Sequence, residues 1–248
     1  MQRDEIKIRE IETFDEMDRC LELQRKVFSF NDLDVSPRRH LVVTKQSGGF
    51  TLGAFTGEEL VGLTITVPAF RGEERGFYSH MAAVLPEYQS FGIGGRMKWA
   101  QREIALSKNV KFIKWTFQPA QARNAFFNLE KLGAVIRQYV PNFYGTGFTS
   151  IGARSELESD RVYGEWELES DKVVALAKGE SYQESGEILK EIEIPHDWNS
   201  LLLSDGKAAE SEQNRIKEEF RIAFSSGLVC RGFRRGKDRP AYLFYKAE

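Results

Sequence analysis

The most constraining feature of this 248-residue chain is a group of glycines between a predicted strand and a predicted helix. The strand covers residues 77–85, and from Ile93 onward apolar residues recur every three to four positions, as in a helix packed on one side. Gly92, Gly94 and Gly95 stand between them. Glycine lets backbone N–H groups approach a phosphate closely, and a helix N-terminus carries about half a positive charge. The segment therefore predicts either an anion-binding turn or a plain glycine-rich connection.

Three phosphate-binding motifs can be compared with this turn. A Walker A loop ends in Gly-Lys-Ser/Thr, whereas this turn ends in Gly94-Gly95-Arg96. A dinucleotide-binding fingerprint follows the first strand of a βαβ unit, whereas this turn follows a predicted hairpin deep in the chain. The run Gln89-Ser90-Phe91-Gly92-Ile93-Gly94 resembles the third motif, the Gln/Arg-x-x-Gly-x-Gly/Ala pyrophosphate signature of the GNAT acyltransferase superfamily.

Hydrophobic periodicity predicts an α/β fold with a mixed sheet over the first 145 residues. A capping box from Thr13 to Glu16 marks the start of the first helix. The order is strand, helix, two strands in a hairpin, strand, helix, strand, helix, strand, at residues 5–11, 13–28, 50–55, 60–70, 77–85, 93–104, 112–118, 123–132 and 135–143.

The resemblance to GNAT proteins covers about residues 5–145 and implies a mixed, mainly antiparallel central sheet flanked by helices. It also implies that the strand at 77–84 splays from the strand at 112–118, which leaves a slot for the pantetheine arm of CoA. The residues that the resemblance places at acetyl-CoA or another acyl-CoA are Met81, Ala82, Val84, Gln89, Ser90, Phe91, Gly92, Ile93, Gly94, Gly95, Arg96, Asn124 and Asn128.

Acyl transfer to an amine needs a base for the ammonium proton and a proton for the leaving sulfur. His80 is the only histidine near the glycine turn, and its ordinary pKa of about 6.5 suits a base. Alternation predicts that Tyr78, His80, Ala82 and Val84 share one face of their strand. Tyr78 and His80 resemble, by position, the paired histidine bases of one branch of the family, the serotonin N-acetyltransferases. The alternative is a structural histidine.

One position departs from the family pattern. The family's usual tyrosine, which commonly protonates the CoA thiolate, stands four residues before a glycine, and here Leu129 stands four residues before Gly133. Tyr144 and Tyr139 lie on or just after the following strand, and either could replace it. Each also fits a packed or surface tyrosine.

Composition bounds the classes of partner. The chain has 35 Lys+Arg against 37 Asp+Glu, so no general basic field attracts nucleic acid. Its two cysteines and three histidines match no zinc spacing, and no apolar stretch reaches about 18 residues. We expect a cytoplasmic protein with no metal, nucleic-acid or membrane partner. The basic stretch 231–239 predicts a solvated turn, with CoA phosphate, nucleic acid or a partner as less favoured ligands.

Two domains are expected, a GNAT-like acyl-CoA-binding domain at 1–150 and a smaller α/β extension at 151–248 that packs on it. In the extension, hydrophobic periodicity predicts the order strand, helix, strand, helix, strand, strand, at residues 162–168, 172–177, 188–194, 207–224, 228–233 and 241–245. Its last four elements repeat the order strand, helix, strand, strand of residues 5–70, which favours a partial second copy of the fold.

The leading hypothesis is an acyltransferase that moves an acetyl or other short acyl group from CoA to an amine of a small molecule or peptide by direct attack. The alternative is a non-catalytic acyl-CoA-binding or scaffolding protein with a degenerate GNAT site. A third hypothesis is an interaction protein whose tail is the functional part. The sequence leaves a monomer and a homodimer both open.

Overall fold

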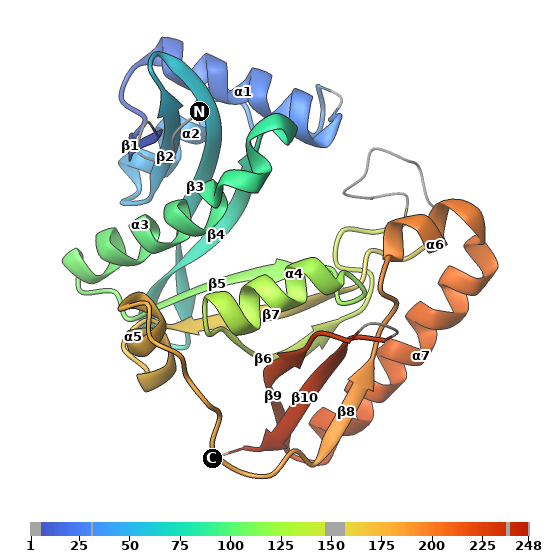
Figure 1. Ribbon diagram of the computed structural model, residues 1–248. Coiled ribbons are helices and arrows are strands. Elements are labelled where there is room, and N and C mark those ends of the chain that lie inside the picture. The colour runs from blue at the N-terminus through green and yellow to red at the C-terminus, as the bar shows by residue number, and fades with distance from the viewer. Residues whose placement is uncertain (1–5, 31, 147–156, 237–238, 248) are drawn as a thin grey trace. The chain divides into compact units, whose positions relative to one another are not determined.

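The computed structural model describes residues 6–30, 32–146, 157–236 and 239–247 (Figure 1). The chain forms two compact units, Met1–Lys114 and Trp115–Glu248, and the limit between them falls inside strand β5 (Phe112–Phe117). The domain boundary predicted near residue 150 lies among residues 147–156, outside the described residues. The division into residues 1–150 and 151–248 therefore stays a prediction.

Unit 1 is an antiparallel sheet with three helices (Figure 1). β1 pairs with β2, β2 with β3 and β3 with β4, and the first half of β5 joins β4 in parallel. The strands that lie wholly in this unit are β1 (Ile6–Glu10), β2 (Phe50–Thr56), β3 (Glu59–Arg71) and β4 (Glu74–Val84). The helices are α1 (Phe14–Phe28), α2 (Arg38–Gln46) and α3 (Ile93–Ser107).

Unit 2 continues from β5 with a second set of strands, in the spatial order β5-β7-β6-β9-β10-β8. The pairs β6–β7, β6–β9, β9–β10 and β10–β8 are antiparallel. The strands are β6 (Val135–Val140), β7 (Arg161–Glu167), β8 (Lys190–Glu193), β9 (Leu228–Arg234) and β10 (Ala241–Lys246). The helices are α4 (Ala122–Phe126), α5 (Asp171–Ala177), α6 (Trp198–Ser204) and α7 (Gly206–Ser225).

The predicted fold class, a mainly antiparallel mixed sheet with helices, is confirmed. The expected repeat is present in the order of elements but not in the pairing. In unit 1 the first strand pairs with the second, β1 with β2, whereas in unit 2 β8 pairs with β10, the last strand of its set. The last four elements of unit 2 are therefore not a topological copy of the first hairpin region.

Aromatic side chains fill the core of unit 2. Trp166 is fully buried, packs edge-on against Trp115 with ring centroids 5.9 Å apart, and donates its indole N–H to the Leu132 carbonyl at 2.6 Å. Phe220 of α7 contacts Tyr242 and Phe244 of β10 edge-on. These rings explain why α7 and the last strands fold against each other, since burying such rings supplies much of a core's stability.

Two helices, α2 and α6, have no counterpart among the predicted elements. α2 follows Pro37 and has no side-chain cap, so its sequence lacks the usual start signal. α6 has a cap, with the Asp197 carboxylate accepting from the Ser200 N–H at 3.0 Å, but it is only 7 residues long. Strand β4 is not buried on both faces, because His80 and Ala82 are exposed.

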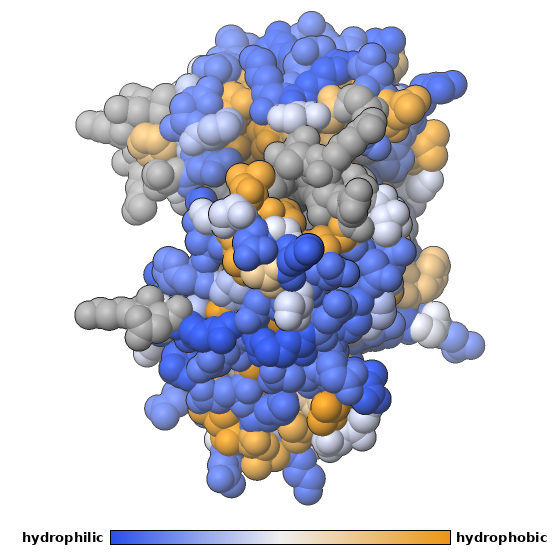
Figure 2. Space-filling view, turned by 90° about the vertical axis from the view of Figure 1, so that its right-hand side faces the viewer, coloured by the Kyte–Doolittle hydropathy of each residue, from blue (hydrophilic) through white to orange (hydrophobic). Residues whose placement is uncertain are grey.

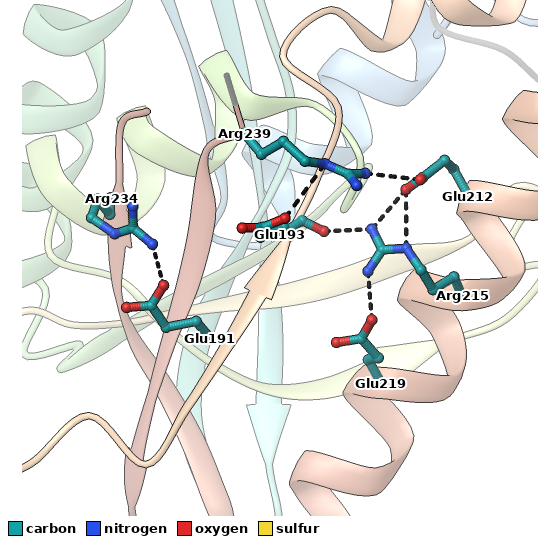
Figure 3. Close-up of polar contacts among 7 residues, drawn as sticks. All are labelled: Glu191, Glu193, Glu212, Arg215, Glu219, Arg234 and Arg239. Carbon is teal, nitrogen blue, oxygen red and sulfur yellow. Dashed lines mark hydrogen bonds and ion pairs between the residues drawn. The ribbon is translucent and has the colours of Figure 1, made fainter. Parts of the chain in front are cut away.

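Edge strand β8 is held in place by ion pairs (Figure 3). Arg215 of α7 bonds Glu219 at 2.5 Å and Glu212 at 2.6 Å and also donates to the Glu193 carbonyl at 2.6 Å. Arg239 pairs with Glu212 at 2.8 Å, and Arg234 of β9 pairs with Glu191. Charged side chains along an edge strand also discourage pairing with other chains.

The surface in Figure 2 is mostly hydrophilic, with hydrophobic residues gathered mainly at its lower end and near its upper part. Large apolar side chains that are exposed in unit 2 include Ile188, Leu189 and Ile222. Within the described ranges, no helix combines the length and the apolar character that crossing a bilayer requires.

The predicted capping box of α1 is confirmed and predicts a pH-dependent contribution to stability. The Glu16 carboxylate accepts from Arg9 at 2.5 Å and from the Glu12 and Thr13 N–H groups at 2.8 and 3.3 Å. These bonds, with the Arg9 bond the largest cause, lower the pKa of Glu16 from 4.5 to about 2. A lowered carboxyl pKa stabilises the fold above pH 4.5, and this stabilisation is lost as the pH falls toward 2.

We expect Glu16→Gln to cost about 1 kcal/mol at pH 7, the usual value of a helix cap, and less as the pH falls below 4.5. Urea denaturation of wild type and variant from pH 7 to pH 3 measures this difference. Glu22→Gln, on the same helix and more exposed, is the control, and its effect should stay within about 0.5 kcal/mol. A Glu16→Gln cost that does not change with pH would contradict the carboxylate's role.

Candidate functional site

The glycine turn of unit 1 forms the N-terminus of α3. Pro86–Phe91 forms a 3-10 helix, and Gly92 then takes a left-handed conformation, with φ of 73°, that glycine adopts without strain. The first helical bond runs from the Arg96 N–H to the Gly92 carbonyl at 3.2 Å. The N–H groups of Ile93, Gly94 and Gly95 come before it and have no acceptor within the helix. They form a set of donors at the positive end of the helix dipole.

The space in front of these donors is open. A Cβ atom added at Gly94 would meet no heavy atom within 4 Å outside the local helix backbone, and no side chain caps the helix. Gln89 donates its side-chain amide to the Val84 carbonyl at 3.1 Å, which ties the turn to the end of β4. Arg96 donates to the Ile6 carbonyl of β1 at 2.6 Å. Gln89 and Arg96 thus hold the turn, and the backbone faces open space.

The other residues predicted at the turn are placed as follows. Ile93 is fully buried and anchors the first turn of α3, and Phe91 packs partly against the core of unit 1. Met81 and Val84 of β4 are also packed partly against this core. The side chain of Ser90 lies outside the described residues.

Strand β4 carries one residue more than β3. Ile65 is opposite Met81 and Thr66 is opposite Ser79, so His80 between them is the extra residue of a β-bulge. Ser79 lies toward α3, since its hydroxyl is 3.4 Å from the side-chain oxygen of buried Gln101. His80 points toward Ser36 and His40 instead.

The bulge changes which residues share a face. Val84 is opposite Gly62, and an added Cβ at Gly62 would meet Met97 of α3, so this pair faces α3. Ala82 shares that face by alternation. The prediction that Tyr78, His80, Ala82 and Val84 share one face therefore holds for Tyr78 and His80 and is wrong for Ala82 and Val84.

His80 belongs to a polar cluster that joins β4, α1, α2 and the loop between the two helices. Its Nε2 is 3.3 Å from the Ser36 hydroxyl, and its ring meets the His40 ring edge-on with centroids 5.5 Å apart. The Ser36 N–H donates to the buried Gln24 side chain at 2.8 Å, and the Gln24 amide donates to the Ser36 carbonyl at 3.3 Å. These two bonds to Gln24 fix the position of the Ser36 backbone.

The surroundings of His80 favour its neutral form. Desolvation by neighbouring protein atoms is the main cause that lowers its pKa from 6.5, and the charge of His40 acts in the same direction. The ring still keeps an exposed face. A neutral, reachable imidazole near pH 7 is what a general base requires.

Along the β4–β5 edge, pairing stops early. In unit 1 the described pairs are Phe77 with Ile113 and Tyr78 with Lys114. β3 in contrast accompanies β4 as far as Val84. From Ser79 onward, no partner strand is described for this edge of β4 within unit 1. The splay between the strands at 77–84 and 112–118 stays a prediction.

Unit 2 holds the predicted residues Asn124 and Asn128. Asn124 is exposed and donates its amide to the Gln121 side chain at 3.3 Å. Asn128 is buried and accepts from the Trp115 indole N–H at 3.2 Å. One oxygen lone pair of Asn128 is therefore used by the protein. The role of both residues at CoA stays a prediction.

The candidate proton donors of unit 2 differ in their partners. Tyr139 donates its hydroxyl to fully buried Asp160 at 2.7 Å, and its pKa is raised by burial first and by Asp160 second. This hydroxyl is committed to a structural bond. Tyr144 is 42% exposed, and its ring lies 5.3 Å from the Arg161 guanidinium carbon. Of the two, Tyr144 is the more exposed.

Leu129, at the position of the family's tyrosine, is fully buried in a π-helical turn, Phe127–Lys131, that extends α4. Of the described residues in the basic stretch 231–239, Arg231, Arg234 and Arg239 pair with Glu184, Glu191 and Glu193, and Arg235 lies 3.5 Å over the Phe126 ring. No group of three or more His, Cys, Asp or Glu side chains in the described ranges could hold a metal ion.

Sequence reasoning missed His40, Ser36 and Gln24. All three lie 40 to 56 residues before His80, and neither their spacing nor their type marks them as a set. The one signal was that His40 is a second histidine in the predicted domain. Only the unpredicted helix α2 and the bulge bring them together.

Comparisons with known proteins bear on the fold and the family of this chain. Residues 12–134 match the acetyltransferase (GNAT) family. A GNAT-family protein from Desulfovibrio desulfuricans has a TM-score of 0.54 at 13% identity and covers 66% of this chain and 99% of its own. The NatC complex bound to Gag peptide and CoA has a TM-score of 0.53 at 14% identity, with 66% and 99% covered.

The ribosomal-protein-S18-alanine N-acetyltransferase from Escherichia coli has a TM-score of 0.51 at 14% identity and covers 65% of this chain and 92% of its own. No curated protein matches the sequence. At these identities the solved structures show a shared fold, that of the acyl-CoA-dependent acetyltransferases. The family match adds the assignment: this chain belongs to the acetyltransferase (GNAT) family.

The burial of Leu129 predicts the outcome of restoring the family's residue. We expect Leu129→Tyr to destabilise the protein by about 1–3 kcal/mol, since it adds volume and a hydroxyl to a closed site. Thermal denaturation measures the loss. Leu203→Tyr, at a 71% exposed leucine of α6, is the control and should be nearly neutral. A Leu129→Tyr protein as stable as wild type would mean that the site has room for a tyrosine.

Proposed function

We propose that this protein transfers an acetyl or other short acyl group from CoA to an amine, with the amine attacking the thioester directly. The observation that carries the proposal is the α3 N-terminus, where N–H donors without an acceptor in the helix and open space at Gly94 coincide with the family's pyrophosphate signature. The donor set fits two phosphate groups in chemistry and in charge. CoA enters here as a substrate.

The acyl-bearing end of the substrate is proposed to lie along β4 beyond Tyr78, where the strand edge has no partner in unit 1. Backbone N–H groups there can stabilise the oxyanion that forms when the amine attacks. His80 removes the ammonium proton, because only the free amine is nucleophilic. The departing thiolate takes a proton from water.

The acceptor is proposed to be a primary amine of a peptide or small molecule. The structural neighbours named above and an aminoglycoside 6'-acetyltransferase, with a TM-score of 0.51 at 18% identity, define the probes for a first assay. These probes are acetyl-CoA with an alanyl peptide, a lysine-containing peptide and an aminoglycoside. Release of free CoA thiol would support catalysis, and CoA binding without turnover on any amine would favour the non-catalytic alternative.

The first test concerns the glycine turn. We expect Gly94→Val to fold like wild type, because its side chain enters open space, and to lose CoA binding, because that space is where the phosphates lie. At a CoA concentration of 100 times Kd, the wild type gains about 2.7 kcal/mol of stability, and the variant should gain none. Calorimetric titration and thermal shift with CoA measure this.

The control is Gly206→Val, at the first residue of α7, where an added Cβ also meets nothing within 4 Å. It should keep full CoA affinity. Equal CoA affinity in wild type and Gly94→Val would show that the N-terminus of α3 is not the phosphate site.

The second test concerns His80 as the base. We expect His80→Gln to lower kcat by about 10²- to 10⁴-fold with little change in Tm or in KM for acetyl-CoA. The wild-type rate should fall as the pH drops below 6.5, since the pKa of His80 is lowered and protonation removes the accepting lone pair. Retention of full kcat and of this acidic limb in His80→Gln would assign the proton transfer to water or another group.

A further inference from the structure

The polar cluster around His80 contains two residues that the proposed function has not used. Ser36 is buried, and its hydroxyl is 3.3 Å from His80 Nε2. His40, in the first turn of α2, presents its ring at 78° to that of His80 with centroids 5.5 Å apart. His80 thus has a polar partner at one nitrogen and an aromatic ring against one side.

We propose that Ser36 and His40 are positioning residues for His80, with Ser36 fixing the tautomer and His40 fixing the ring and opposing its protonation. This inference deepens the proposed function and rests on it where catalysis is measured. The residues of this unit come from α1, the loop before α2, α2 itself and β4, and His80 lies 40 residues beyond His40, so the unit forms only in the folded chain.

The tautomer follows from hydrogen-bond accounting. A neutral imidazole has one N–H and one lone pair. When the Nε2–H donates to the Ser36 hydroxyl, the lone pair is on Nδ1, and that nitrogen is the base. Ser36 can serve as a fixed acceptor because Gln24 holds its N–H and its carbonyl through two buried bonds at 2.8 and 3.3 Å.

His40 is the ionisable group that acts on His80. The other charged groups of α1, α2 and their loop are engaged elsewhere or exposed. Arg19 pairs with Asp15, Arg25 with Glu22 and Asp32, Arg38 with Asp18 and Glu16 with Arg9. Lys26, Asp34, Arg39 and Lys45 are exposed. On the strands, Tyr78 is half-buried and Lys114 bonds the Phe70 carbonyl. Among the described groups, only the charge of His40 is a resolved influence on His80.

As a consequence, His80 remains neutral, and able to accept a proton, at a lower pH. Two imidazolium rings in edge contact repel each other, so protonation of one opposes protonation of the other. A substrate ammonium brought near His80 would meet a neutral acceptor. His40 therefore lowers the proton affinity of His80, and Ser36 determines which nitrogen of His80 is basic.

Imidazole NMR tests this directly, because the chain has only three histidines, His40, His80 and His196. We expect His40→Gln to move the His80 titration upward, because it removes the repulsion between the two rings. His196→Gln, at an exposed residue of unit 2, is the matched control and should leave the His80 titration unchanged. A His80 titration unmoved by His40→Gln would overturn the pairing.

The role of Ser36 is tested with ¹⁵N shifts and kinetics. In wild type the His80 proton should be on Nε2, and Ser36→Ala should give a mixture of tautomers. On the acceptor found above, Ser36→Ala should lower kcat about tenfold with KM for acetyl-CoA unchanged, and Ser36→Thr should restore it. Ser47→Ala, exposed at the other end of α2, is the control.

The outcomes separate the two proposals. A changed tautomer and a shifted titration support the positioning unit even if His80→Gln remains active, in which case only the assigned base is wrong. Unchanged ¹⁵N shifts in Ser36→Ala overturn the tautomer role even if His80 is essential for turnover.

Discussion

Strand β4 contains one residue, His80, that has no partner on β3, and the candidate catalytic arrangement depends on it. Without the bulge, the residues of β4 would alternate strictly against those of β3. The pairs before and after His80 could not then both point to the sides of the sheet that they face now. The bulge lets Ser79 and Thr66 bond Gln101 of α3, while His80 points to the other side of the sheet, toward α2. A local defect in the ladder thus aims one side chain out of a well-paired sheet.

In the proposed function, the two ends of the substrate depend on different parts of unit 1. The phosphate end needs only backbone, since the N–H groups of α3 are available to any sequence that allows Gly92 its positive φ. The acyl end needs side chains from several segments, because Ser36, His40 and His80 come from three separate pieces of chain. The first part of the site is local in sequence and the second is tertiary.

This difference explains what the sequence could predict. The glycine turn, the capping box at Thr13 and most strands were readable, because each is specified by residues within a few positions of one another. α2 was not, since Pro37 precedes it without a side-chain cap and its face packs on β2 and β3 rather than following a strong period. With α2 unpredicted, His40 could not be placed near His80. The bulge could not be read either, because register is set between strands.

Strand β6 begins where the match to the GNAT family ends. β6 lies between β7 and β9 and pairs with both, through Ile136 to Gly164 on one side and Ile136 to Cys230 on the other. The Glu130 side chain accepts the Phe233 N–H at 2.6 Å, and the Tyr242 hydroxyl donates to the Pro119 carbonyl at 2.7 Å. The last strands therefore bond directly to α4's extension and to the segment after β5.

A chain ended near residue 150 would leave β6 with two bare edges and would remove Trp166 and Phe220 from the core of unit 2. Exposed strand edges pair with other chains, and an opened aromatic core loses the burial that holds it together. The C-terminal strands thus complete the sheet that the family fold begins. Any role they have toward an acceptor comes after that structural one, and the ion pairs that fix edge strand β8 serve the same end.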